Sequence, residues 1–251
     1  MNAFAGAHIY GKHKINSMKN SIERRKFLMQ SAALVFSATT LPSLVAGRTT
    51  MGNEKFLNDK KPPLPPELVS EFVRIAHFDL VKVKEMLDKE PMLVNACWDW
   101  GAGDFETALG AASHVGNRDI AFYLLDHGGR KDIFCSAMLG DRDVVHSFVK
   151  VNPEIVNSDG PHKISLLYHV AASGDTKMAN IVKPHVRDKI DFDHSLQAAV
   201  KGSHASMTEW LLKNGCNDPS VPDFAGNTPL QNAEKKKLKD IADLLKKHGA
   251  K

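Results

Sequence analysis

Cysteine is scarce in this chain, with only Cys97, Cys135 and Cys216 among 251 residues. The three are widely and unevenly spaced, and none belongs to a Cys-x-x-Cys pair. This pattern excludes a small disulfide-framed scaffold and a cysteine-based zinc finger. We therefore expect the three side chains to be buried free thiols.

Common catalytic motifs are also missing. The sequence has no His-Glu-x-x-His pair and no Gly-x-Ser-x-Gly elbow. The short Gly101-Ala102-Gly103 segment is followed by acidic residues, which would repel a phosphate group. We therefore expect no catalysis, no cofactor and no metal site.

Most of the positive charge lies in the first 47 residues. The formal net charge is +4, but residues 1–47 hold six basic residues and one acidic residue, so the remainder carries −1. A nearly neutral body lacks the basic surface that binds phosphate backbones. The sequence therefore predicts no nucleic-acid partner.

Residues 1–47 are predicted to be a targeting segment. Arg24 and Arg25 precede Phe27 and Leu28 and a moderately apolar stretch, so the segment resembles a bacterial twin-arginine signal peptide. Met18 is an alternative start. Residues 27–46 approach the length of a membrane span, but polar residues interrupt them. We expect export through this signal, to the periplasm or otherwise out of the cytoplasm, with membrane attachment only if the leader is uncleaved.

A proline-rich linker is predicted at residues 48–66, and a repeated pattern follows it. Each unit has an alanine-rich helix, a glycine, and an amphipathic helix that begins near an acidic residue. The glycines are Gly116, Gly140, Gly174 and Gly202. A unit with one apolar helical face cannot bury it alone, so the units must stack.

The clearest copies resemble the ankyrin repeat family. Asp223, Gly226, Thr228, Pro229 and Leu230 match its Asp-x-x-Gly-x-Thr-Pro-Leu opening, and residues 106–129 form a second good match. The resemblance implies an all-α solenoid of stacked helix-turn-helix units over residues 67–251. It implies five or six repeats, with the first and middle ones divergent, and short projecting fingers.

In that family the fingers and inner helices form a concave surface that recognises other proteins. The candidate fingers are residues 95–106, 157–164 and 217–227. Trp98 and Trp100 alternate with Asp99, and alternate residues of an extended segment share a face. Three interpretations remain open: the tryptophans cover the core at the first repeat, anchor a protein, or stack on a sugar or another small ligand.

The predicted function is an exported, monomeric binding module that recognises another exported protein through this face. The candidate binding residues are Trp98, Asp99, Trp100, Asp104, Phe105, Glu106, His114, His162, Tyr168 and His169. The Gly160-Pro161-His162 turn should fix the second finger tip beside the first. The alternative is a small-molecule or carbohydrate binder, or a metal-assisted hydrolase, built on Asp99, Asp104, Glu106 and His114. That alternative requires these groups to converge.

Overall fold

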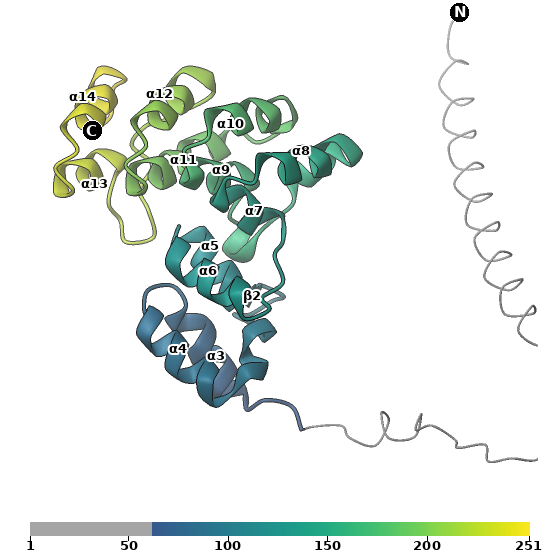
Figure 1. The fold of residues 1–251 in the computed structure, drawn as a ribbon. Helices are drawn as coiled ribbons and strands as arrows, with labels where there is room; N and C mark the ends of the chain where they lie inside the picture. Colours follow the sequence, from purple (N-terminus) through teal and green to yellow (C-terminus); the bar gives the residue numbers. More distant parts are fainter. Residues whose placement is uncertain (1–61) are drawn as a thin grey trace, which may run out of the picture. The chain divides into compact units, whose positions relative to one another are not determined.

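The structure is a computed structural model that describes residues 62–251. The predicted leader at residues 1–47 and most of the predicted linker lie outside the described residues. The described part contains twelve α-helices in six successive pairs (Figure 1). The pairs are α3 (Pro66–Ile75) with α4 (Leu80–Lys89), α5 (Ala108–His114) with α6 (Arg118–Asp126), α7 (Ile133–Leu139) with α8 (Arg142–Val151), α9 (Leu166–Ser173) with α10 (Thr176–Val182), α11 (Ile190–Lys201) with α12 (Ala205–Asn214), and α13 (Pro229–Lys235) with α14 (Lys239–Lys247).

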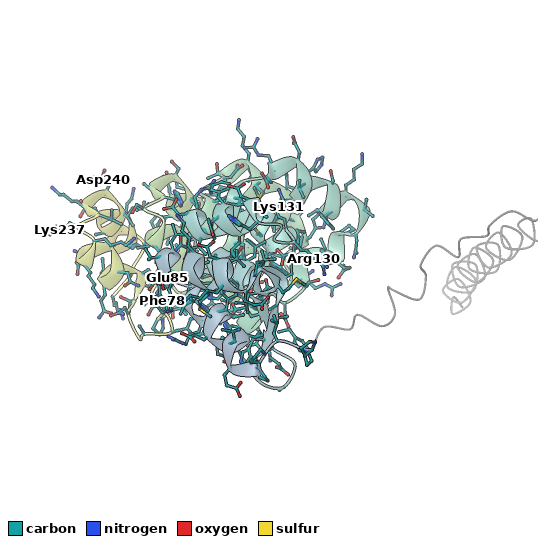
Figure 2. All side chains as sticks on the ribbon, turned by 60° about the horizontal axis from the view of Figure 1, so that its bottom comes forward. Phe78, Glu85, Arg130, Lys131, Lys237 and Asp240 are labelled. Carbon is teal, nitrogen blue, oxygen red and sulfur yellow. The ribbon has the colours of Figure 1, made fainter. Side chains whose placement is uncertain are left out.

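The pairs stack in chain order from α3 and α4 to α13 and α14 (Figure 1). The first helix of each pair contacts the first helix of the next, and among the second helices α4 contacts α6 and the run from α8 to α14 is in successive contact. Figure 2 shows Phe78 and Glu85 on the first pair, and Lys237 and Asp240 on the last. The prediction of an all-α solenoid of stacked helix pairs is thus confirmed. Among the described helices, none is long and apolar enough to cross a membrane.

Polar caps fix where the inner helices begin. The side chains of Thr107, Asp132, Ser165 and Thr228 each accept a hydrogen bond from the backbone N–H three residues later. These bonds satisfy N–H groups that have no partner within the helix. The threonine and serine positions in the repeated pattern therefore mark the helix starts.

The core divides into two apolar clusters along the array. One is built around Phe72, Leu93, Ile120 and Leu124 in the first pairs, and the other around Leu167, Phe192 and Leu211 in the later pairs. Both arise because each helix presents a single apolar stripe to its neighbours. Helix α5, with the sequence Ala-Leu-Gly-Ala-Ala-Ser-His, consists mostly of small residues, so its neighbours can approach it closely.

The first finger is a β-hairpin. A 3₁₀ helix, η1 (Pro91–Asn95), leads into strand β1 (Cys97–Asp99), which pairs antiparallel with β2 (Phe105–Thr107). In this register Trp98 lies opposite Glu106. The hairpin places residues 100–104 at the finger tip and leads directly into α5.

The second and third fingers are tight loops without strands. The second contains two 3₁₀ turns, η2 (Pro153–Asn157) and η3 (Pro161–Lys163), and is closed by a hydrogen bond from Gly160 N to Ile164 O. A further 3₁₀ turn, η4 (Lys183–His185), follows α10. The third finger closes through Asp223 N and Asn227 O.

The second finger reaches back past α7 to α5. The turn η3 contacts α5, and a Cβ atom at Gly110 would lie 3.3 Å from Cγ of Pro161. Gly110 therefore gives this finger room to lie on a helix that belongs to an earlier pair. This contact brings the tips of the first two fingers together.

Two asparagines tie the loops of neighbouring repeats. Asn95 donates from Nδ2 to Gly128 O at 2.9 Å and accepts at Oδ1 from Arg130 N at 2.8 Å. Asn157 bridges His185 O and Arg187 N in the same way. Each amide satisfies one acceptor and one donor of the next loop, so each finger base is held by the following repeat.

Candidate functional site

Glu106 lies at the centre of a cluster of polar side chains beneath the first finger. It belongs to β2, and its carboxylate is fully buried. Nε1 of Trp100 donates to its Oε2 at 2.8 Å, and Nδ1 of His114 lies 3.0 Å from its Oε1. The hairpin register and the start of α5 together turn this carboxylate inward.

His114 and His77 face Glu106 from two helix ends. His114 is the last residue of α5, and His77 follows α3. Nδ1 of His77 lies 2.9 Å from the carbonyl oxygen of Arg74, which leaves Nε2 directed at Oε2 of Glu106, 3.7 Å away. The backbone of the first helix pair thus orients one imidazole toward the hairpin.

His162 completes the cluster from the second finger. Its backbone N–H donates to Oδ1 of Asp104 at 2.8 Å, and its Nδ1 lies 2.8 Å from Oδ2 of the same carboxylate. Its Nε2 then lies 3.5 Å from Oε2 of Glu106. His162 and Lys163 both have φ near +57°, a left-handed conformation that is uncommon outside glycine. This conformation presents the imidazole to the first finger.

The four side chains form a compact group of potential metal ligands. One donor atom from each of His77, Glu106, His114 and His162 lies within 4.8 Å of every other. Oε1 of Glu106 and Nδ1 of His114 are buried and have no hydrogen-bond partner within residues 62–251. Although these two atoms are 3.0 Å apart, they lack hydrogen-bond alignment, so their contact is electrostatic.

The electrostatics of the cluster favour an ionised Glu106 carboxylate and a neutral His77 imidazole. Burial alone would raise the pKa of Glu106, but His114, the indole N–H of Trp100 and His77 more than offset it and hold that pKa below its usual value. Burial lowers the pKa of His77. The N–H of His162 stabilises the Asp104 carboxylate and lowers its pKa. Neutral imidazole and ionised carboxylate are the forms that bind metals.

The predicted site residues divide between this cluster and its surroundings. Trp100, Asp104, Glu106, His114 and His162 are brought together, although Glu106 and His114 are buried beneath the finger surface. The convergence that the hydrolase alternative required is therefore met by three of its four groups. The sequence predicted no metal site, whereas Glu106, His114 and His162 belong to the group of potential metal ligands.

The other predicted residues lie apart from the cluster. Trp98 packs against the core, and its ring meets Trp100 edge-to-face at 6.5 Å, so the two indoles form no flat platform. The carboxylate of Asp99 accepts the N–H groups of Gly101 and Gly103 within the hairpin turn. Phe105 is exposed, and Tyr168 is partly buried against the core.

His169 was wrongly placed on the binding face by the sequence analysis. It is fully buried, its Nδ1 lies 2.9 Å from the carbonyl oxygen of Ser165, and its ring packs near Phe134. The residue adjacent to Tyr168 on a helix necessarily faces a different direction, and here that direction is the core.

Sequence reasoning did not identify His77. It lies 29 residues before Glu106 in the divergent first repeat, and its neighbour Phe78 occupies the position of the repeat glycine. Only the packing of α3 against α5 and β1 brings it to the cluster. The available signal was a polar, metal-competent side chain at the end of an inner helix, the same place that His114 occupies in the next repeat.

Two adjoining hollows lie between the finger tips. The first, of about 750 Å³, is lined by the first and second fingers and the start of α7, including Asp104, Phe105 and Asp159. The second, of about 330 Å³, lies between the second and third fingers and includes Tyr168 and Phe224. His162 and Lys163 line both. We call the surface formed by the three finger tips and these hollows the finger face.

No model of a protein family matches the chain, and no curated protein matches it. Among solved structures, the chain is similar to an ankyrin repeat domain from Acinetobacter baumannii AYE. The two share 21% identity over 72% of this chain and 98% of that chain, with a TM-score of 0.40.

Proposed function

We propose that this chain is an exported bacterial binding module that recognises a protein partner through the finger face. The observation that carries the proposal is the pair of adjoining hollows between three successive finger tips, joined at His162 and Lys163. Stacked repeats present extended concave surfaces of this kind to their partners. Binding of a partner requires no catalytic step in this chain. The fold alone does not decide the matter, because one fold can carry many activities.

Aromatic side chains on the fingers support recognition of a protein. Phe105 is 63% exposed on the first finger, and Phe224 is 89% exposed on the third. Exposed aromatic groups beside a hollow are typical anchors for a partner, because burying them on binding removes apolar surface from water. Asp159, on the second finger, is exposed and makes no ion pair within residues 62–251. It offers a contact for a basic partner side chain.

The test compares matched phenylalanine variants. Phe105→Ala with Phe224→Ala removes both finger aromatics, whereas Phe122→Ala with Phe148→Ala removes two phenylalanines from outer helices that are 47% and 48% exposed. Each tagged protein is used to capture partners from the extracytoplasmic fraction of the source organism, and the captured protein is then purified for binding measurements. We expect at least a tenfold loss of affinity for the finger variant only. Equal affinity in both variants contradicts recognition at this face.

Export is tested separately from binding. Replacing Arg24 and Arg25 by lysine keeps the charge of the leader but removes the paired arginines on which the proposal of twin-arginine export depends. We expect the variant to remain in the cytoplasm while the wild type reaches the periplasm, as measured by fractionation. The N-terminus of the exported protein, read by mass spectrometry, then shows whether the leader is removed.

A further inference from the structure

Four side chains from four separate segments converge on one buried point. His77 follows α3, Glu106 lies on β2, His114 ends α5, and His162 lies in η3 of the second finger. We propose that these residues bind one divalent transition-metal ion, zinc in preference to others, in a closed four-ligand site that holds the first two fingers on the solenoid. This inference does not depend on the identity of any partner.

The spacing of the donor atoms fits this ion. Tetrahedral zinc with bonds of about 2.0–2.1 Å places neighbouring ligand atoms roughly 3.3 Å apart. Nδ1 of His114 lies 3.0 Å from Oε1 of Glu106, and Nε2 of His162 and Nε2 of His77 lie 3.5 and 3.7 Å from its Oε2. One donor atom from each of the four residues lies within 4.8 Å of every other, so the four donors surround space for a single ion.

Unpaired polar atoms within the cluster point to a ligand. Oε1 of Glu106 and Nδ1 of His114 are buried without a hydrogen-bond partner. Such groups are costly to bury and are rare in folded proteins. An ion bound between them satisfies both atoms at once. The side chains of His77 and His162 are 21% and 28% exposed, so the ion can enter from that side.

Hydrogen bonds from surrounding atoms orient the ligand side chains, as is usual in metal sites. Nδ1 of His77 faces a backbone carbonyl, and Nδ1 of His162 faces the Asp104 carboxylate, so Nε2 is the free nitrogen of each ring. Trp100 occupies Oε2 of Glu106 and leaves Oε1 free. Hydrogen bonds from the far nitrogen of a ligating imidazole to a carboxylate or carbonyl fix its tautomer and orientation.

The types and number of donor atoms indicate which metal ion the site binds and whether the ion is structural or catalytic. Three imidazoles and one carboxylate favour zinc and related transition metals over magnesium and calcium, which prefer oxygen ligands. Four protein donors complete a tetrahedron and leave no position for a reactive water, as in structural zinc sites. The proposed ion therefore has a structural role and links the two fingers to the solenoid. A four-ligand site of this kind fits a metal-assisted hydrolase less well.

The first experiment measures zinc binding to the full chain after removal of metals with a chelator. Zinc is titrated in competition with a chromophoric chelator, and bound metal is counted by elemental analysis. We expect one tightly bound zinc per chain and a rise in melting temperature on zinc addition, because the ion binds the folded state. A chain that binds no zinc overturns the proposal.

A matched pair of histidine variants locates the site. His77 and His127 both follow a helix and both direct Nδ1 at a backbone carbonyl, but His127 lies outside the cluster. We expect His77→Gln to weaken zinc binding by more than about 100-fold and His127→Gln to leave it unchanged. Far-UV circular dichroism of the metal-free proteins checks that both fold. Zinc binding that is equal in both variants overturns the proposal.

Asp104 is a positioning residue, because it acts on the metal through His162. Asp104→Asn keeps an oxygen for the backbone N–H of His162 and replaces the other carboxylate oxygen with an amide. We expect zinc affinity to fall about 10–100-fold with one zinc still bound. Unchanged affinity contradicts the assigned orientation of His162.

Cobalt substitution identifies the ligands. Four-coordinate cobalt with nitrogen and oxygen ligands absorbs more strongly in the visible than six-coordinate cobalt, and we expect the stronger spectrum. Cys97 lies on β1 near Glu106 and is the thiol carried by the first finger. A thiolate-to-cobalt band in the near ultraviolet, lost in Cys97→Ser, would replace the proposed ligand set with one that includes this thiol.

Discussion

Trp100 and Glu106 are joined across the tip of the first finger by a hydrogen bond of 2.8 Å from Nε1 to Oε2. The donor lies just beyond β1, and the acceptor lies on β2, so the bond forms only when the hairpin has its observed register. It fixes the buried carboxylate and leaves the second oxygen directed toward His114. Trp100, which the sequence indicated as a candidate binding residue, therefore also holds the buried carboxylate of Glu106 in place.

Trp100→Phe should destabilise the chain because it removes this donor from a buried carboxylate. We expect the free energy of unfolding to fall by about 1–3 kcal/mol, measured by urea denaturation in the presence of a chelator. Trp98→Phe is the matched control, because within residues 62–251 the Trp98 indole nitrogen makes no hydrogen bond. Equal losses in the two variants would show that ring size, rather than the hydrogen bond, accounts for the effect.

His169 should make stability depend on pH. Burial lowers its pKa from 6.5 to about 4 in the folded chain. Between these values the unfolded chain binds a proton that the folded chain does not, so the free energy of unfolding falls as pH falls from 6.5 to 4. The full contribution is roughly 3 kcal/mol.

The measurement compares wild type with His169→Asn by urea denaturation at several pH values in chelator. Asparagine can retain a donor near the carbonyl of Ser165 but does not titrate. The difference in free energy of unfolding between the two proteins should change between pH 6.5 and 4 and stay constant below pH 4. A difference that is independent of pH would mean that the folded chain protonates His169 at its ordinary pKa.

Asn95→Ala should loosen the base of the first finger. The change leaves Gly128 O and Arg130 N without their side-chain partner, so we expect a loss of about 1–3 kcal/mol in the free energy of unfolding. Asn152 precedes the second finger and makes no capping bond, so Asn152→Ala should change stability by less than about 0.5 kcal/mol. A similar loss in both variants would exclude the bridging bonds as the cause.

Thr228→Ala should weaken the last repeat. Thr228 and Gln231 form a reciprocal capping box at the start of α13. We expect a loss of about 1 kcal/mol, with most of it recovered in Thr228→Ser, which keeps the hydroxyl group. Thermal unfolding followed by circular dichroism measures both variants. If serine does not restore stability, the methyl group is the important part of this side chain.

The fold was predictable because its signals are local. Thr107 and Thr228 cap helices that start beside them, and Gly116 and Gly140 have the positive φ that ends an inner helix. Each signal acts within a few residues and recurs from repeat to repeat. A single sequence is therefore sufficient to place most helix pairs.

The site was only partly predictable because it depends on contacts between repeats. Glu106, His114 and His162 were recognised as candidates, but their grouping with His77 requires α3 to pack on α5 and the second finger to pass α7. The shared face of Trp98 and Trp100 was expected from an extended strand, yet β1 ends at Asp99. The chain turns there, and the two rings meet edge-to-face.

The reach of the second finger back to α5 changes how the array should unfold. In a simple stack each repeat contacts only its neighbours, so stability is a sum of local and nearest-neighbour contributions. Here His162, which precedes the fourth helix pair, touches groups of the first and second pairs and bypasses the third. Loss of α3 and α4 would therefore lower the stability of repeats beyond the adjacent one. The N-terminal two thirds of the array should melt as one cooperative unit rather than fray pair by pair.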